Sequence, residues 1–194
     1  MAAASDQATH LLSPADIRHF VLGTTPENYD VMADFYTKFL GAEVSVRSEF
    51  LTMLRYDHEH HRLGIAAIPG TKSRNAIGGT ISGLRHVAFG FNTLGDLATF
   101  YEQRKAQGIL PDWVVNHGLS TSMYYLDPDG NQAEVLVDNF DTSEEAIAYM
   151  ASPEFQENPI GVEFDPEEFV RKVRNGVDEK EIKTRPNIGR RMKR

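Results

Sequence analysis

The sequence lacks three features, and each absence excludes a class of function. It contains no cysteine, so disulfide bonds, thiolate metal sites and cysteine nucleophiles are excluded. It has no excess of positive charge, and its formal net charge of -8 argues against a nucleic-acid partner. It has no apolar run of membrane-spanning length and no secretory apolar segment. We therefore expect a cytoplasmic protein with no membrane partner.

The composition is that of a folded chain. Hydrophobic residues make up 41% and aromatic residues 10% of the 194 residues, which is enough to build a core. The length fits one domain, or two small modules fused in tandem with a tail. An enzyme or a small-molecule binding protein is the expectation at this level.

Two stretches of the chain resemble each other. "DIRHFVL" around His19 returns as "GLRHVAF" around His86. These histidines are separated by the same number of residues as Gly41 and Gly108, each of which follows a helical pattern. Several coincidences in the same order predict an internal duplication of a βαβββ unit.

The predicted fold class is α+β. We predict two tandem βαβββ modules that form a curved mixed sheet, over residues 16–68 and 84–138, with a turn-rich connector over 69–83. Residues 1–15 are predicted to be a flexible leader, and 139–194 a helical and extended C-terminal tail. Within the tail, "TSEEAIAYMA" and "DPEEFVRKVRNG" are predicted helices, the first capped by Thr142 or Ser143.

Predicted strands carry two histidines and one carboxylate that could bind a metal: His19, His86 and Glu134. This ligand set leaves open positions on an Fe(II) ion, where oxygen chemistry can take place. Glu134 lies in a strand with apolar neighbours, and a carboxylate that points inward needs a cationic partner. A divalent metal would supply that partner, and an ion pair with Arg18, Arg85 or another cation is the alternative.

The duplication also predicts what is missing from the metal site. Ala67 precedes Glu134 by the same number of residues as His19 precedes His86, so it is the predicted equivalent of Glu134 in the first module. An alanine side chain cannot bind a metal. A closed structural site would have a fourth protein ligand, whereas a catalytic site keeps that position open for substrate or water. The modules are therefore predicted to surround a catalytic metal site.

The span from about Asp16 to Asp138 resembles the vicinal oxygen chelate superfamily. That superfamily includes glyoxalase I, bleomycin-resistance proteins, fosfomycin-modifying enzymes and type I extradiol ring-cleavage dioxygenases. Within it, the chain is most similar to the one-domain type I extradiol catechol dioxygenases, with a C-terminal extension of its own. The first-strand histidine, second-module histidine and late-strand glutamate of those enzymes match His19, His86 and Glu134.

Three further residues match that family, and the resemblance implies their roles. His61, beside His60 in "EHHRLGIAA", is implied to be the acid–base group. His117 in "VNHG" and Tyr124 are implied to hydrogen-bond to the substrate oxygens, with Tyr125 as the alternative to Tyr124. The cofactor implied is Fe(II), with Mn(II) as an alternative. The partners implied are a catechol-type substrate and O2, and a homo-oligomer is expected because small members commonly associate.

Two other functions compete with this interpretation. One is a different metal-dependent enzyme of the superfamily: a glyoxalase, an epimerase or a thiol transferase. The other is a metal-free binding protein of the drug-sequestering kind, which would not need two histidines and a glutamate.

Overall fold

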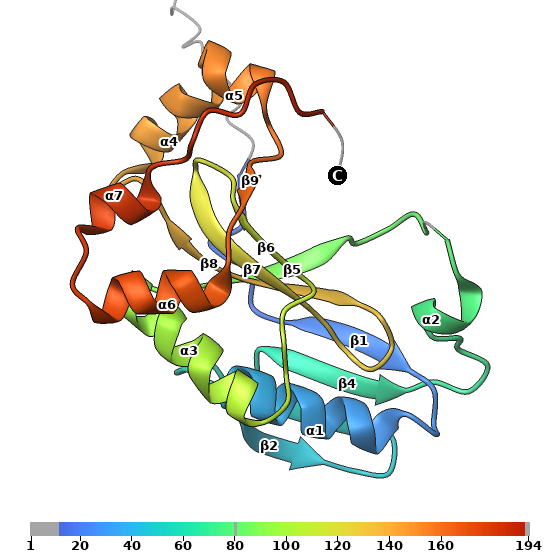
Figure 1. Cartoon of the computed structure of the whole chain (residues 1–194). Coiled ribbons are helices and arrows are strands. Elements are labelled where there is room, and N and C mark those ends of the chain that lie inside the picture. The colour runs from blue at the N-terminus through green and yellow to red at the C-terminus, as the bar shows by residue number, and fades with distance from the viewer. Residues whose placement is uncertain (1–11, 80, 193–194) are drawn as a thin grey trace, which may run out of the picture.

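The computed structural model describes residues 12–79 and 81–192 (Figure 1). Most of the predicted leader over 1–15 lies outside these residues. The described chain is α+β and contains two mixed sheets, which confirms the predicted fold class and the two βαβββ modules. The strands form two separate sheets rather than one continuous curved sheet. None of the helices in the described ranges has the length and apolar character needed to cross a membrane.

The first module follows the predicted order of elements. Its elements are β1 (Phe20–Thr24), α1 (Tyr29–Leu40), β2 (Glu43–Arg47), β3 (Leu51–Arg55) and β4 (Leu63–Ala67). The strands lie in the order β1-β4-β3-β2, with β1 parallel to β4. A short helix, α2 (Arg74–Ile77), lies in the predicted connector. The pairing of β2 with β3 shifts register between Val44 and Val46, so Ser45 forms a bulge in an edge strand.

The second module repeats this order and gains a strand from the tail. Its elements are β5 (His86–Gly90), α3 (Leu94–Ala106), β6 (Trp113–Asn116), β7 (Ser120–Leu126) and β8 (Gln132–Asp138). The tail contributes α4 (Ser143–Met150), α5 (Pro153–Glu157), β9 (Val162–Glu163), α6 (Pro166–Arg174) and α7 (Glu179–Lys183). The strand order is β5-β8-β7-β6-β9, because β9 pairs antiparallel with the outer edge of β6. Both predicted tail helices are present, and Thr142 caps α4 with a capping box.

Helices α1 and α3 lie side by side and share one core with both sheets (Figure 1). Phe39 of α1 is fully buried and packs against Phe100 of α3, with ring centroids 5.3 Å apart, and against Tyr125 of β7 at 5.1 Å. Helix α1 ends at Gly41, which has φ 62°, the left-handed conformation that glycine adopts most easily. Arg104 of α3 donates from Nε to the Phe39 carbonyl oxygen at 3.0 Å, which ties the end of α1 to α3.

The strand register corrects one sequence-based prediction. Val21 pairs with Gly64, and the equivalent Ala88 of the second module pairs with Glu134. The first-module equivalent of Glu134 is therefore Gly64, and not Ala67 as predicted from the constant spacing. The spacing changes because the β2–β4 region and the β6–β8 region differ in length. The conclusion is unchanged, since glycine also supplies no metal ligand.

Two buried carboxylates in the turn after β7 join the modules. Asp129 accepts hydrogen bonds from Thr24 Oγ1 and from Asn28 Nδ2, both at 2.6 Å. Asp127 accepts a hydrogen bond from the Tyr36 hydroxyl at 3.0 Å, and burial raises the pKa of its carboxyl group. The turn belongs to the second module and its three donors belong to the first. These polar contacts fix how the two modules sit against each other.

We expect Asp129→Ala to lower the free energy of unfolding by roughly 3–6 kcal/mol, because two charge-assisted hydrogen bonds of about 1.5–3 kcal/mol each are lost. Urea denaturation followed by circular dichroism measures the change. The matched control is Asp138→Ala, which removes an exposed carboxylate at the end of β8. If the two variants were equally stable, Asp129 would not join the modules as described.

Candidate active site

The candidate site lies on the face of the second sheet that points away from the core. Successive side chains of a strand point to opposite faces. Tyr124 pairs with Glu134, and Trp113 pairs with Tyr124, so these three side chains share one face. Tyr125 points the other way, into the core beside Phe39. Of the two neighbouring tyrosines, Tyr124 is therefore the one on the face of Glu134.

His86 and Glu134 form the centre of this face. His86 Nε2 lies 3.0 Å from Glu134 Oε2, and the edge of the His86 ring meets Tyr124 with centroids 5.4 Å apart. Glu134 is only 4% exposed, so its carboxylate needs a cation or strong donors nearby. Arg18, one of the two arginines predicted as alternative partners, pairs instead with Asp16 and Glu59.

His117 and Tyr124 are also in direct contact. His117 Nε2 lies 2.9 Å from the Tyr124 hydroxyl oxygen, and His117 Nδ1 lies 2.5 Å from the Ile160 carbonyl oxygen. Burial lowers the pKa of His117 below its usual value, which favours the neutral ring. The structure thus brings three of the predicted residues of the second module around Glu134: His86, His117 and Tyr124.

The first module contributes a separate cluster of histidines. The rings of His19 and His61 lie with centroids 4.3 Å apart, because His19 and His61 each come just before one of the paired parallel strands β1 and β4. His60 Nδ1 lies 2.5 Å from His61 Nδ1. Burial, and the neighbouring rings of His19 and His60, lower the pKa of His61. His58 is exposed and lies in the polar turn expected for it.

The structure does not bring the predicted ligands together as one set. Among residues 12–79 and 81–192, no three histidine, aspartate or glutamate side chains lie close enough to hold a metal ion. His86 contacts Glu134, while His19 contacts His61. The donor chemistry still fits a divalent metal, because a nearly fully buried carboxylate has an imidazole as its close partner.

Two features of this face were not assigned from the sequence. Trp113 stacks on Tyr124 with ring centroids 4.9 Å apart and donates from its indole nitrogen to Glu163 at 3.0 Å. The other feature is the Ile160 carbonyl, which the tail brings to His117. Alternation along β6 could have placed Trp113 on the face of His117, but no sequence signal marks a backbone carbonyl.

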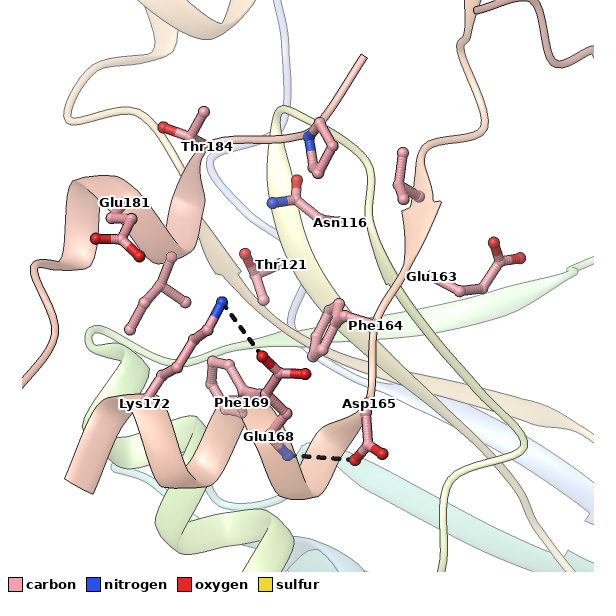
Figure 2. A pocket seen from close by; sticks show the side chains of 13 residues that line it. Asn116, Thr121, Glu163, Phe164, Asp165, Glu168, Phe169, Lys172, Glu181 and Thr184 are labelled. Carbon is pink, nitrogen blue, oxygen red and sulfur yellow. Dashed lines mark hydrogen bonds and ion pairs between the residues drawn. The ribbon is translucent and has the colours of Figure 1, made fainter. Parts of the chain in front are cut away.

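A cavity of about 340 Å³ lies on the opposite side of the second sheet, between β6, β7 and the tail (Figure 2). Asn116 and Thr121 form part of its wall, and both point away from the face of Tyr124. Lys172 lies 3.6 Å from Glu168, and Glu163 pairs with Arg191. None of the predicted histidines lines this cavity, so we assign the chemistry to the other face.

Solved structures with this fold include a glyoxalase/dioxygenase from Nostoc punctiforme. The two chains share 16% identity with a TM-score of 0.53, and the match covers 66% of this chain and 97% of that one. At this identity, the likeness concerns the fold alone.

Two curated proteins are much more similar in sequence. Biphenyl-2,3-diol 1,2-dioxygenase 2 of Rhodococcus globerulus is 43% identical over 148 residues, which is 76% of each chain. Biphenyl-2,3-diol 1,2-dioxygenase 3 of the same organism is 40% identical over 169 residues, which is 87% of each chain. The second match covers 169 residues, whereas only 138 residues precede the tail, which begins at Asn139. Part of the tail is therefore shared with that relative and is not an extension peculiar to this chain.

Residues 17–135 match the Glyoxalase/Bleomycin resistance protein/Dioxygenase superfamily. The curated relatives are oxidoreductases of the dioxygenase class, as expected from the resemblance. The chain therefore belongs to the Glyoxalase/Bleomycin resistance protein/Dioxygenase superfamily.

Proposed function

We propose that this chain is an extradiol dioxygenase that cleaves the ring of a catechol-type aromatic diol. In this reaction the carbon–carbon bond beside the two hydroxyls breaks, and both atoms of O2 enter the product. The observation that supports it most is the His86–Glu134 pair on one face with Tyr124 and His117. The identity with two biphenyl-2,3-diol 1,2-dioxygenases supports a two-ring diol as the substrate. The homo-oligomer and the cytoplasmic location stay predictions.

We assign the metal to His19, His86 and Glu134. Two neutral imidazoles and one carboxylate suit Fe(II), with Mn(II) as the alternative. When bound, the metal supplies a Lewis acid and redox centre at which the diol and O2 meet. Gly64 stands where a second carboxylate would stand in a symmetric site, which disfavours glyoxalase-type chemistry with a carboxylate base from each module.

The chain's own residues would bind the diol and move its protons. His61 is assigned as the group that accepts a proton from a diol hydroxyl; its Nδ1 contacts His60, so the transfer is assigned to Nε2. His117 and Tyr124 would orient the substrate oxygens through hydrogen bonds. Trp113, stacked on Tyr124, would keep that hydroxyl in place and exclude water from its side.

The first sheet offers an apolar surface for the substrate ring. Val21 and Gly64 pair with each other, and Gly64 also pairs with Met53, so all three lie on the face that points away from the core. Val21 is 54% exposed there. A Cβ atom at Gly64 would lie only 3.1 Å from Val21 Cγ2, so glycine keeps this surface open. We assign this surface to the second ring of a biphenyl-type diol.

Glu134→Gln should lower the iron content of the purified protein by more than about tenfold, because an anionic ligand is replaced by a neutral amide. Metal analysis after anaerobic purification measures the iron content per chain. Glu144→Gln on exposed α4 is the control. Iron at the level of the control in Glu134→Gln would remove this residue from the ligand set.

His61→Ala should keep its iron but turn over catechols about 10²–10⁴-fold more slowly, as expected when a general acid–base group is lost. Oxygen uptake and the yellow absorbance of the ring-opened product report turnover. His58→Ala changes an exposed histidine of the same turn and should behave as the wild type. Loss of iron in His61→Ala would mean that His61 is a ligand and that its assigned role is wrong.

Gly64→Val should raise KM for biphenyl-2,3-diol by about tenfold or more while changing KM for catechol little, because the added methyl groups fill the space assigned to the second ring. Gly90→Ala is the control, since a Cβ atom there meets no neighbouring atom within 4 Å. An equal change in KM for both substrates would place the second ring elsewhere.

A further inference from the structure

His117 has a defined proton position in this structure. The Ile160 carbonyl oxygen can only accept a hydrogen bond, so the His117 nitrogen that faces it, Nδ1, carries the hydrogen. In the neutral ring Nε2 is then an acceptor, and the Tyr124 hydroxyl, 2.9 Å away, donates to it. The tail thus sets the direction of the hydrogen bond between the two residues assigned to the substrate oxygens.

The Ile160 carbonyl is held in place by a small loop, residues 158–161. Asn158 Oδ1 accepts from the backbone nitrogens of Ile160 at 3.2 Å and of Gly161 at 2.8 Å, and Asn158 Nδ2 donates to the Gly161 carbonyl at 3.1 Å. Gly161 has φ 107°, and a Cβ atom there would lie 2.3 Å from the Asn116 carbonyl oxygen. The loop therefore lies directly against the backbone beside His117, at a distance that only glycine allows.

Arg185 joins this loop to His117. Its Nη1 donates to the Asn158 carbonyl at 2.5 Å and to the His117 carbonyl at 3.3 Å, and its Nη2 donates to the Glu154 carbonyl at 3.2 Å. Only 3% of its side chain is exposed. Within the described part of the chain its Nε has no hydrogen-bond partner, so the cation is buried at some cost. Arg185 also pairs with Glu154 Oε1 at 3.3 Å, and its backbone contacts lie on both sides of the His117–Ile160 hydrogen bond.

We propose that Arg185 and the loop 158–161 are positioning residues that hold His117 as the Nδ1–H tautomer, with Nε2 accepting from Tyr124. The proposal deepens the proposed function, on which it rests for the role of His117 in catalysis. The hydrogen bonds themselves do not depend on that function. The C-terminal tail, which lies outside both repeated modules, is thus part of the active site through its backbone.

Nitrogen NMR of the full chain labelled with ¹⁵N-histidine tests this, because the two ring nitrogens differ in chemical shift when only one is protonated. The seven histidines are assigned by single substitutions, with His117→Asn identifying the signals of interest. Any paramagnetic metal is first exchanged for Zn(II), so the readout does not depend on activity. In the wild type we expect a protonated Nδ1 and an unprotonated Nε2 at His117.

Arg185→Ala should change the ratio of the two His117 tautomers by about tenfold, the size expected when one hydrogen bond is lost. The matched control is Arg174→Ala, because Arg174 is also a tail arginine but pairs with Thr99 and Glu102 of α3, outside this loop. If Arg185→Ala fails to fold, Arg185→Lys takes its place. This variant keeps the charge without the planar guanidinium group, and its tautomer ratio should lie between that of the wild type and that expected for Arg185→Ala.

Three results would overturn the proposal: a wild-type His117 protonated on Nε2, an unchanged ratio in both Arg185 variants, or an equal change in Arg174→Ala. Failure of the proposed function looks different. A chain with the expected tautomer that consumes no O2 with catechols would reject the dioxygenase activity and leave the positioning of His117 in place.

Discussion

The whole arrangement depends on the buried carboxylates of the turn between β7 and β8. A desolvated carboxylate is tolerated only when donors surround it, and Asp129 finds its donors on the first module, in Thr24 and Asn28. Because hydrogen bonds are directional, they fix the angle between the modules more sharply than apolar packing around Phe39 could alone. The same turn leads directly into β8, so the strand that carries Glu134 is oriented by the contact that joins the modules.

The two histidine clusters show how the halves of a duplicated chain become unequal. In the second module His86 faces a carboxylate, whereas in the first His19 faces the imidazole of His61. The difference traces to one register position, which is Glu134 in one sheet and Gly64 in the other. The carboxylate therefore lies on the second sheet, and the first sheet has no side chain at the equivalent position.

Much of the fold followed from the sequence because the repeat supplied the same signal twice. The matched pairs His19/His86 and Gly41/Gly108 fixed the order of strands and helices, and alternation in β8 placed Glu134 on the face opposite Val135 and Val137. The register of Gly64 could not be found in this way, since a constant spacing cannot reveal loops of different length. Strand β9 has two residues, too few for any periodicity, and the role of Ile160 depends on a carbonyl that every residue possesses.

The bulge at Ser45 determines what the outer edge of the first sheet can do. All five residues of β2 are exposed, and a bare edge strand offers its backbone groups to strands of other molecules. The extra residue interrupts the even spacing of those groups, and its hydroxyl turns back to donate to the His60 carbonyl at 2.8 Å. The charges of Glu43 and Arg47 flank the two valines of this strand. A second chain therefore finds no continuous template for strand addition at this edge of the first sheet.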